Sequence, residues 1–139
     1  MVEIFPIQTV KIQPSQLYIS EQKLQKIQNR LDSMKPMLEE PIPIKNLHGK
    51  TIFVDGHTRA LALYLLDKKT IPVYWEYEEL DWEAYEVCVQ WCLDEGIHTV
   101  LDLLPRIVPH EEYVKLWYRR CDKLHHDLEM KRNNFTTPS

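Results

Sequence analysis

One short segment of the sequence gathers the backbone groups and side chains that bind anions. The segment FVDGHTR, residues 53–59, predicts a strand that ends in a glycine turn and passes directly into a helix. The first turn of a helix has unpartnered backbone N–H groups and the positive end of the helix dipole. Gly56 opens this turn, and Thr58 and Arg59 add a hydroxyl and a guanidinium. Together they predict an anion site, for which phosphate is the usual ligand. A capped helix start with a solvated arginine is the alternative.

A stripe of cations on an earlier predicted helix favours the anion site. Lys23, Lys26 and Arg30 are spaced by three and four residues and therefore share one helix face. This stripe borders an apolar stripe of Leu24, Ile27, Leu31 and Met34. Long cationic side chains at such a border lay their stems on the core and turn their charged ends into a cleft. A solvated helix face is the alternative explanation.

The order of these motifs resembles the ParB/sulfiredoxin superfamily. The resemblance covers roughly residues 8–78, and its specific part is the segment DGHTRALA at 55–62 followed by IPV at 71–73. It implies a small α+β fold that binds a nucleotide, with the phosphates at the start of the helix after the glycine turn. In the same alignment the stripe of Lys23, Lys26 and Arg30 falls on the helix face that contacts ATP in sulfiredoxins.

The branches of this superfamily differ in chemistry at the turn. Sulfiredoxins have Gly-Cys-His-Arg there, and His57 stands in place of the reactive cysteine, which argues against a sulfinic acid reductase. ParB proteins have Gly-Glu-Arg-Arg and bind CTP, and Arg59 matches the last of these residues. They also carry a DNA-binding helix-turn-helix. The corresponding turn here, around Gly96, is flanked by the acidic residues Asp94, Glu95 and Asp102. We therefore do not expect DNA binding.

The nearest motif is that of the free serine kinases of the superfamily, Asp-Gly-His-His-Arg with an early catalytic glutamate. Residues 55–59 depart from it only at Thr58, and Glu21 falls at the place of the early glutamate, although Ser20 replaces the expected histidine before it. The resemblance implies Glu21, Asp55 and His57 as catalytic residues, with Asp55 in contact with Mg²⁺. A first-turn helix carboxylate at Glu21 and an N-cap at Asp55 are the structural alternatives.

Three functions stay open on the sequence. The first is a nucleotide-binding phosphotransferase, an ATP- or ADP-dependent kinase that acts on a small hydroxyl compound. The second is a non-catalytic nucleotide-sensing module whose helical half binds a small molecule or a protein partner. The third is a ParB-like DNA-associated protein. The nucleotide expected in each case is ATP, ADP or CTP with Mg²⁺, and the protein alone offers no complete metal site.

Charge and cysteine content limit the classes of protein to which this chain can belong. Residues 1–79 carry no net charge, and residues 80–139 carry the whole net charge of −4, so neither half has the basic excess of a duplex-DNA binder. Cys88, Cys92 and Cys121 make an odd set without a metal-ligand pattern, which is typical of a reduced cytoplasmic protein. We see no signal peptide and no apolar run long enough to span a membrane.

The pattern of the first half predicts an α+β fold with a small mixed sheet, within a nucleotide-binding region at residues 1–79. An edge strand interrupted by Pro6 is expected over residues 2–12. A helix capped by Ser20 and stopped by Pro36 follows. A hairpin around His48 and Gly49, a buried helix over residues 57–66 and a strand over residues 71–75 complete this half.

The second half predicts a helical extension at residues 80–130 that packs on the first, followed by a frayed tail at residues 131–139. Asp81 is the expected cap of one helix, and a short helix over residues 99–104 is expected to stop at Pro105. The longest predicted helix covers residues 109–130. Its packing seam has spacings of three and four residues and comprises Val114, Trp117, Cys121, Leu124 and Leu128.

Overall fold

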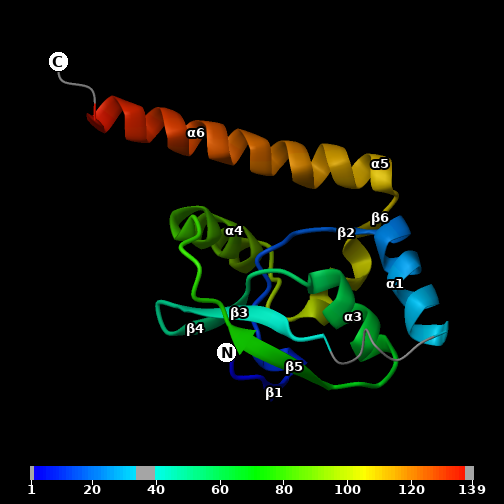
Figure 1. Ribbon diagram of the computed structural model, residues 1–139. Coiled ribbons are helices and arrows are strands. Elements are labelled where there is room, and N and C mark those ends of the chain that lie inside the picture. Colours follow the sequence, from blue (N-terminus) through cyan, green and yellow to red (C-terminus); the bar gives the residue numbers. More distant parts are fainter. Residues whose placement is uncertain (1, 34–39, 137–139) are drawn as a thin grey trace.

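A four-stranded mixed sheet forms the base of the molecule (Figure 1). The computed structural model describes residues 2–33 and 40–136. The sheet order is β1 (Phe5–Gln8), β5 (Thr70–Trp75), β3 (Ile42–Leu47) and β4 (Lys50–Phe53). Strand β3 is antiparallel to β4 and parallel to β5, while β1 lies antiparallel at one edge. Pro6 therefore lies in an edge strand, where a missing backbone donor is tolerated.

Local sequence signals position the remaining elements of the first half. A 3₁₀ turn, η1 (Thr9–Lys11), follows β1. Ser20 caps α1 (Glu21–Ser33), because its hydroxyl oxygen accepts a 3.3 Å bond from the Lys23 N–H. His48 and Gly49 have positive φ in the β3–β4 turn, as a tight hairpin requires. Helix α3 (His57–Leu65) begins directly after Gly56. The predicted positions of Met34 and Pro36 lie outside the described residues.

The second half is helical and lies over the first. Asp81 caps α4 (Trp82–Asp94) by accepting a 3.2 Å bond from the Ala84 N–H. A 3₁₀ segment, η2 (Val100–Arg106), leads into β6 (Ile107–Val108), which pairs in parallel with β2 (Ile19–Ser20). The chain then continues through α5 (His110–Tyr113), the π-helical turn η3 (Val114–Tyr118) and α6 (Arg119–Thr136). In Figure 1 this last helix lies across α4, on the side away from the sheet.

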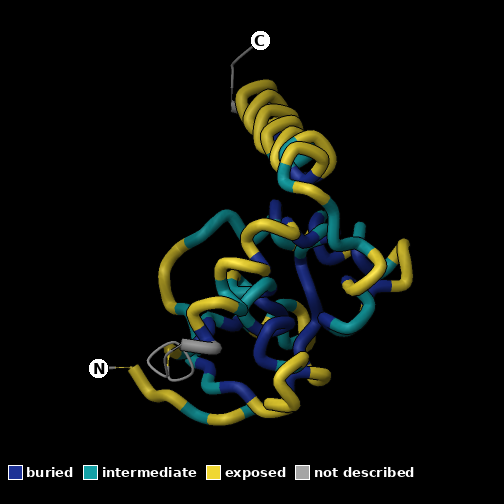
Figure 2. Tube along the Cα trace, turned by 90° about the vertical axis from the view of Figure 1, so that its right-hand side faces the viewer, coloured by how far each residue is buried: buried dark blue, intermediate teal, exposed yellow. Residues whose placement is uncertain are grey.

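A single apolar core joins the two halves. It includes Leu61 of α3, Phe53 of β4, Cys92 of α4 and Leu124 of α6. Figure 2 shows the buried residues concentrated in the sheet and the helices next to it, whereas α6 is exposed along most of its length. The predicted α+β class, the mixed sheet and the helical C-terminal stretch are thus confirmed.

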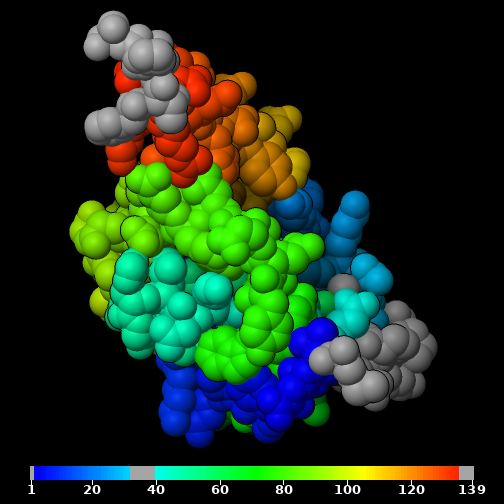
Figure 3. All heavy atoms as spheres, turned by 60° about the vertical axis from the view of Figure 1, so that its left-hand side comes forward, coloured from blue at the N-terminus to red at the C-terminus, as the bar shows by residue number. Residues whose placement is uncertain are grey.

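The long helix packs on α4 through contacts of both η3 and α6 (Figure 3). The Trp91 and Trp117 rings meet edge to face with centroids 6.2 Å apart. Arg132 donates two bonds to the Asp81 carboxylate, at 2.8 and 3.1 Å, and Lys131 donates to Glu83 at 2.9 Å. The helix continues to Thr136, beyond the expected end near residue 130, and these ion pairs tie its residues 131 and 132 to the start of α4.

Two further details differ from the sequence predictions. Pro105 lies inside η2 instead of stopping it, because a short 3₁₀ segment loses only one backbone bond to a proline near its end. The β2–β6 pair was not predicted, since each strand has only two residues and its partner lies in the other half of the chain. In residues 2–33 and 40–136 no helix is both long enough and apolar enough to cross a membrane.

Candidate functional site

The predicted anion-binding segment lies in the wall of a cavity of about 540 Å³. The cavity is open to solvent and is lined by the start of α3, the cationic face of α1 and the helix that runs from α5 into α6. Its wall carries four cationic side chains and one carboxylate, so the wall is predominantly positive. The lining residues are Gln16, Lys23, Lys26, Ile27, Arg30, Asp55, Gly56, His57, Thr58, Arg59, Tyr113, Trp117 and Tyr118.

Gly56 shapes the turn from β4 into α3. It is the helix N-cap, with φ of 83°, and no side chain caps this helix. A Cβ at this position would lie 3.0 Å from Ile42 Cγ2 on β3, so both the backbone conformation and the close packing require glycine. The first bond within the helix runs from the Ala60 N–H to the Gly56 carbonyl at 2.8 Å. The amides before Ala60 therefore stand at the helix start, where an anion is favoured.

Asp55 does not cap α3, which was the structural alternative to a functional role for this residue. Gly56, and not Asp55, occupies the N-cap position, and the Asp55 side chain is exposed and lines the cavity. It contributes the only carboxylate among the cavity-lining residues that the structure describes. No group of three or more His, Cys, Asp or Glu side chains in the described part of the chain is arranged to hold a metal ion.

His57 is a buried, neutral imidazole. Its side chain is held by the Ser15 backbone N–H, which donates to Nε2 at 2.9 Å, and the residue is only 4% exposed. Burial lowers the pKa of His57 to about 4, against an opposing effect from the charge of Asp55. Because Nε2 accepts a bond, the ring proton lies on Nδ1, and Nδ1 has no hydrogen-bond partner within the described residues.

Arg59 is oriented by groups at the start of β3. Its side chain donates a 2.6 Å bond to the Glu40 carboxylate and a 3.2 Å bond to the Pro41 carbonyl. The Arg59 side chain is 14% exposed, whereas that of Glu40 is 58% exposed. Nε of Arg59 is buried and lacks a partner in the described part. The guanidinium is thus fixed at the cavity while its carboxylate partner is accessible to solvent.

Lys23 lies in an aromatic recess formed by the C-terminal half. Its ammonium group donates to the Tyr118 hydroxyl and lies 5.3 and 5.0 Å from the ring centroids of Tyr113 and Tyr118. The two tyrosine rings meet at 4.9 Å. Gln16 donates to the Tyr113 hydroxyl at 3.2 Å. Burial, with help from Tyr118, raises the pKa of the Tyr113 hydroxyl, so this group is protonated at neutral pH.

The π-helical turn explains why the tyrosines of this recess share one face. The Arg119 N–H bonds to the Val114 carbonyl, five residues back, instead of four. The additional residue in this turn carries Tyr118 back toward the face that presents Tyr113. In a regular helix these two side chains, five residues apart, would point in clearly different directions.

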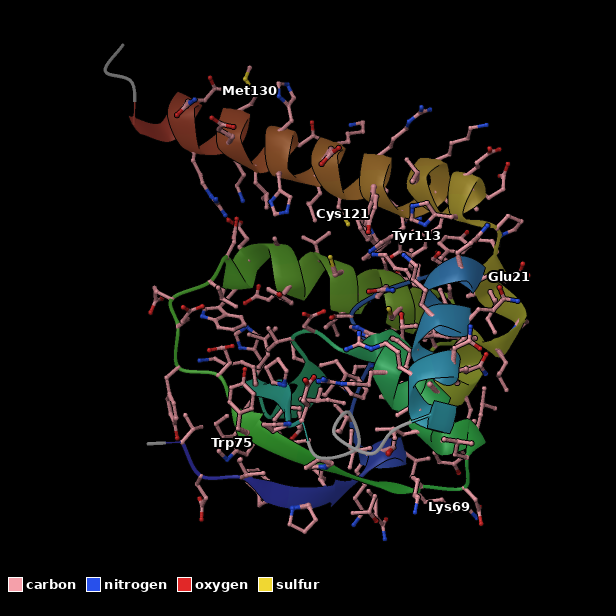
Figure 4. All side chains as sticks on the ribbon, turned by 45° about the vertical axis from the view of Figure 1, so that its right-hand side comes forward. Glu21, Lys69, Trp75, Tyr113, Cys121 and Met130 are labelled. Carbon is pink, nitrogen blue, oxygen red and sulfur yellow. The ribbon has the colours of Figure 1, made fainter. Side chains whose placement is uncertain are left out.

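The structure brings together all but one of the predicted site residues. The cations Lys23, Lys26 and Arg30 and the segment 55–59 line the same cavity. Glu21 does not belong to this lining; it is exposed at the first residue of α1 and lies at the outer edge of the molecule (Figure 4). The structure thus separates Glu21 from Asp55 and His57.

The aromatic wall of the cavity was missed at the sequence level. Tyr113, Trp117 and Tyr118 come from the second half, and Gln16 comes from the segment before α1. Trp117 was predicted as part of a packing seam, and it is indeed buried. The sequence signal for this wall is the pair Tyr113 and Tyr118 close to Trp117, near the start of the predicted helix over residues 109–130. Side chains at the start of a helix can reach a site on a neighbouring element.

Comparison with known proteins finds similarity to solved structures only. No family model and no curated protein matches the sequence. Protein Atu1540 from Agrobacterium tumefaciens has a TM-score of 0.48 and 13% identity, covering 70% of this chain and 50% of that chain. SbnI with a C-terminal truncation, from Staphylococcus aureus, has a TM-score of 0.45 and 22% identity, covering 54% of this chain and 31% of that chain. The chain spans half or less of the length of these structures.

Proposed function

We propose that this chain binds a nucleotide, with its phosphates at the start of α3. The observation that carries the proposal is the convergence of four cations on one helix N-terminus: Lys23, Lys26, Arg30 and Arg59 line the same cavity as the first turn of α3. Phosphate groups are stabilised by backbone amides at a helix start and by guanidinium and ammonium groups. The residues that line the cavity thus offer a phosphate chain both hydrogen-bond donors and positive charge.

The aromatic side of the cavity suits the rest of a nucleotide. Tyr118 is the exposed aromatic residue of this wall, and its ring offers a surface on which a base can stack, whereas Tyr113 and Trp117 are buried next to it. Mg²⁺ in nucleotide sites is held by one or two carboxylates together with phosphate oxygens, and Asp55 fits the part of that single carboxylate. The resemblance of residues 55–59 to the ParB/sulfiredoxin superfamily supports the same class of ligand and leaves ATP, ADP and CTP as the candidates.

The partners of Arg59 suggest how a phosphate enters. The Arg59–Glu40 ion pair lies with its carboxylate in contact with solvent. An incoming phosphate offers the guanidinium an oxygen in place of the one from Glu40, so Glu40 can be released to water while Arg59 keeps an anionic partner. The bond from Arg59 to the Pro41 carbonyl would hold the guanidinium in place during the exchange.

A thermal-shift titration with ATP, ADP, CTP and GTP, each with Mg²⁺, tests the proposal. A nucleotide at a hundred times its Kd stabilises the fold by about 2.7 kcal/mol, which raises Tm by roughly 10 °C. Arg59→Ala is expected to remove most of this shift, because the guanidinium contact to phosphate is lost. Arg119→Ala, which removes an exposed arginine outside the cavity, is the matched control and should leave the shift unchanged. Absence of any shift in the unaltered protein, or equal shifts in both variants, would contradict the proposal.

Phosphoryl transfer to a small hydroxyl compound is a second candidate function, favoured by the place of Asp55 in the cavity wall. In this reaction the acceptor oxygen bonds to the terminal phosphorus, and the bond from that phosphorus to the nucleotide breaks. The shortened nucleotide leaves with the electron pair, and the acceptor proton passes to Asp55. His57, a catalytic candidate by the superfamily resemblance, stays neutral in this step, because burial lowers its pKa to about 4.

A steady-state assay with ATP, Mg²⁺ and a panel of hydroxyl compounds tests this second candidate. Asp55→Asn should lower acceptor-dependent turnover at least 100-fold while nucleotide binding changes less than threefold. Glu21→Gln is the comparison, since Glu21 lies outside the cavity lining and its loss should leave turnover within threefold. A collapse of turnover in Glu21→Gln alone would move the acceptor to the start of α1. Tight nucleotide binding without turnover on any acceptor would favour the non-catalytic module.

A further inference from the structure

The side chain of Gln16 is held in one orientation in the wall of the first cavity. Its Nε2 donates a 2.7 Å bond to the Tyr18 carbonyl and a 3.2 Å bond to the Tyr113 hydroxyl. A carbonyl oxygen can only accept a hydrogen bond, so the amide nitrogen must face Tyr18 and Oε1 must point elsewhere. Rotation of the amide would break both bonds, and the position of Oε1 is therefore fixed.

The backbone around Gln16 is fixed as well. The N–H of the preceding residue, Ser15, donates to Nε2 of the buried His57 at 2.9 Å. The Cys92 thiol donates to the Gln16 carbonyl at 3.5 Å. Gln16 is thus tied to α3, to α4 and to the C-terminal helix, so its side chain loses little freedom when a ligand binds.

The Oε1 atom of Gln16 is an acceptor that the protein does not use. It accepts no hydrogen bond from the described residues, and it is not enclosed, in contrast to Nδ1 of His57. Gln16 lines both the first cavity and a smaller second cavity of about 330 Å³, so there is open space beside its amide. A ligand that places a hydrogen-bond donor there gains a bond to a preorganised partner.

Gln16 lies beside the tyrosine recess. It bonds to Tyr113, whose ring lies 4.9 Å from that of Tyr118, and Figure 4 shows Tyr113 where the C-terminal helix meets α1. Lys23 occupies this recess, whereas Arg30 lies about 10 Å further along α1, seven residues away. Phosphate oxygens are acceptors that seek the cations and are repelled by Oε1, so the part of the ligand next to Gln16 is one that carries donors.

The nucleotide bases differ in the group that they would offer to this acceptor. On the edge away from the sugar, adenine and cytosine carry an amino group, whereas guanine and uracil carry a carbonyl oxygen. The amino group can donate to Oε1, while the carbonyl oxygen would face it as a second acceptor. A base stacked on the exposed ring of Tyr118 lies in the same recess as Gln16.

We propose that Gln16 selects the base of the nucleotide, because its Oε1 accepts a hydrogen bond from the exocyclic amino group of adenine or cytosine. This inference rests on the proposed function and adds to it the residue that determines base specificity. Gln16 takes no part in binding the phosphates. A site built to accept a bond from a ligand group discriminates against an analogue that lacks the group, because the acceptor is then left unpaired.

Calorimetric titration of the full chain with paired nucleotides and Mg²⁺ tests the preference. Inosine triphosphate differs from ATP, and UTP from CTP, in carrying a carbonyl oxygen in place of the amino group. The pair whose amino member binds more tightly decides the test, and its carbonyl member should bind about tenfold more weakly. ATP that lacks its 2′- or its 3′-hydroxyl should bind within about threefold of ATP. A loss of affinity on removal of a ribose hydroxyl, with ATP and inosine triphosphate equal, would place the sugar at Gln16 and overturn the proposal.

The Gln16→Met variant keeps the length of the side chain and removes the acceptor. It should reduce the preference for the amino member to less than about twofold, and the Kd of sodium tripolyphosphate, which has no base, should stay within about twofold. A purely structural role would weaken tripolyphosphate together with ATP. Gln22→Met is the matched control, because Gln22 accepts a bond from the His110 N–H but lies outside the cavity lining, and it should keep the full preference. A preference that survives in Gln16→Met overturns the proposal.

A measurement without substitution decides the matter if Gln16→Met does not fold. In amide NMR spectra of the unaltered protein, ATP should move the side-chain NH₂ signals of Gln16 at least about twice as far as tripolyphosphate does, because only ATP reaches the neighbouring oxygen. Equal movement by the two ligands overturns the proposal.

Failure of this inference can be told apart from failure of the proposed function. If neither nucleotides nor tripolyphosphate bind, the proposed function fails, and the role of Gln16 fails with it. If ATP and inosine triphosphate, like CTP and UTP, bind equally tightly, the nucleotide site stands and only the role of Gln16 fails.

Discussion

The two walls of the first cavity hold their functional groups by different means. The wall at the start of α3 is fixed through the backbone: Gly56 packs on Ile42, and the Ser15 N–H holds the His57 ring at 2.9 Å. The facing wall is built of exposed cations on α1 and of side chains from α5 and η3. Side-chain bonds join α1 to η3, as in the bond from the Lys23 ammonium group to the Tyr118 hydroxyl.

Because of this difference, the two walls should contribute to ligand binding in different ways. Donors that are fixed by buried backbone bonds lose little freedom when a ligand arrives, so they set the position of an anion. Exposed lysine side chains adjust their ends to the ligand and contribute mainly charge. The α3 wall should therefore tolerate few substitutions, whereas substitutions in the α1 wall should affect binding more than folding.

The largest effect is expected for Gly56→Ala. The left-handed conformation and the 3.0 Å approach to Ile42 together should cost about 4 kcal/mol in the free energy of unfolding. Gly49→Ala is the matched control, because Gly49 has φ of 84° but nothing within 4 Å of its Cβ position, and it should cost only about 1 kcal/mol. Urea unfolding measures both. Equal losses would mean that packing on Ile42 is unimportant.

A pH-dependent loss of stability is the next effect. The folded-state pKa of His57 is about 4, below the value of about 6.5 in an unfolded chain. Between these two values the unfolded state binds the proton and the folded state does not, so stability falls as the pH falls from 6.5 to 4. The loss attributable to His57 is about 3 kcal/mol.

Urea unfolding at pH 7 and pH 4 measures this loss. The His57→Gln variant keeps an acceptor for the Ser15 N–H but has no titrating ring, so its decline with pH should be smaller by that amount. An identical decline in both proteins would show that His57 is not the titrating group.

The smallest effects are expected on the α1 wall. Lys26→Ala should weaken nucleotide binding several-fold and leave the unfolding free energy unchanged, because Lys26 is exposed. Lys23→Ala should weaken binding similarly and also cost about 1 kcal/mol, because it loses the contacts to Tyr113 and Tyr118. Thermal unfolding and a nucleotide titration of each variant measure both. A loss of stability in Lys26→Ala as large as that in Lys23→Ala would contradict the contrast between the walls.

The same contrast separates what the sequence could predict from what it could not. Interactions between residues close together in the chain leave a recognisable pattern in the sequence. This pattern predicted the Ser20 and Asp81 caps, the His48–Gly49 turn and the entry into α3. The cations of α1 were predicted as one face, and the cavity wall includes them.

Contacts between distant residues left no such pattern. The Lys23–Tyr118 bond joins residues 95 positions apart, and β2 finds its partner β6 through a two-residue ladder. The exclusion of Glu21 from the cavity lining also depends on how α1 packs, which periodicity does not report. Tyr113 is buried directly before the π-helical turn, whereas the predicted seam began at Val114.

The π-helical turn has a consequence for how this protein tolerates changes in chain length. A single-residue deletion between Val114 and Tyr118 would convert the turn into ordinary α-helix, with every backbone bond remade. Residues four apart share a face in an α-helix, as Tyr113 and Tyr118, five apart, do across this π turn, so the two sides of the helix would stay nearly in register after the deletion. The seam toward α4 and the tyrosine recess around Lys23 would both keep their orientation. The chain should thus accept the loss of one residue here, whereas the same deletion within the regular α6 helix would rotate all following residues by about 100°.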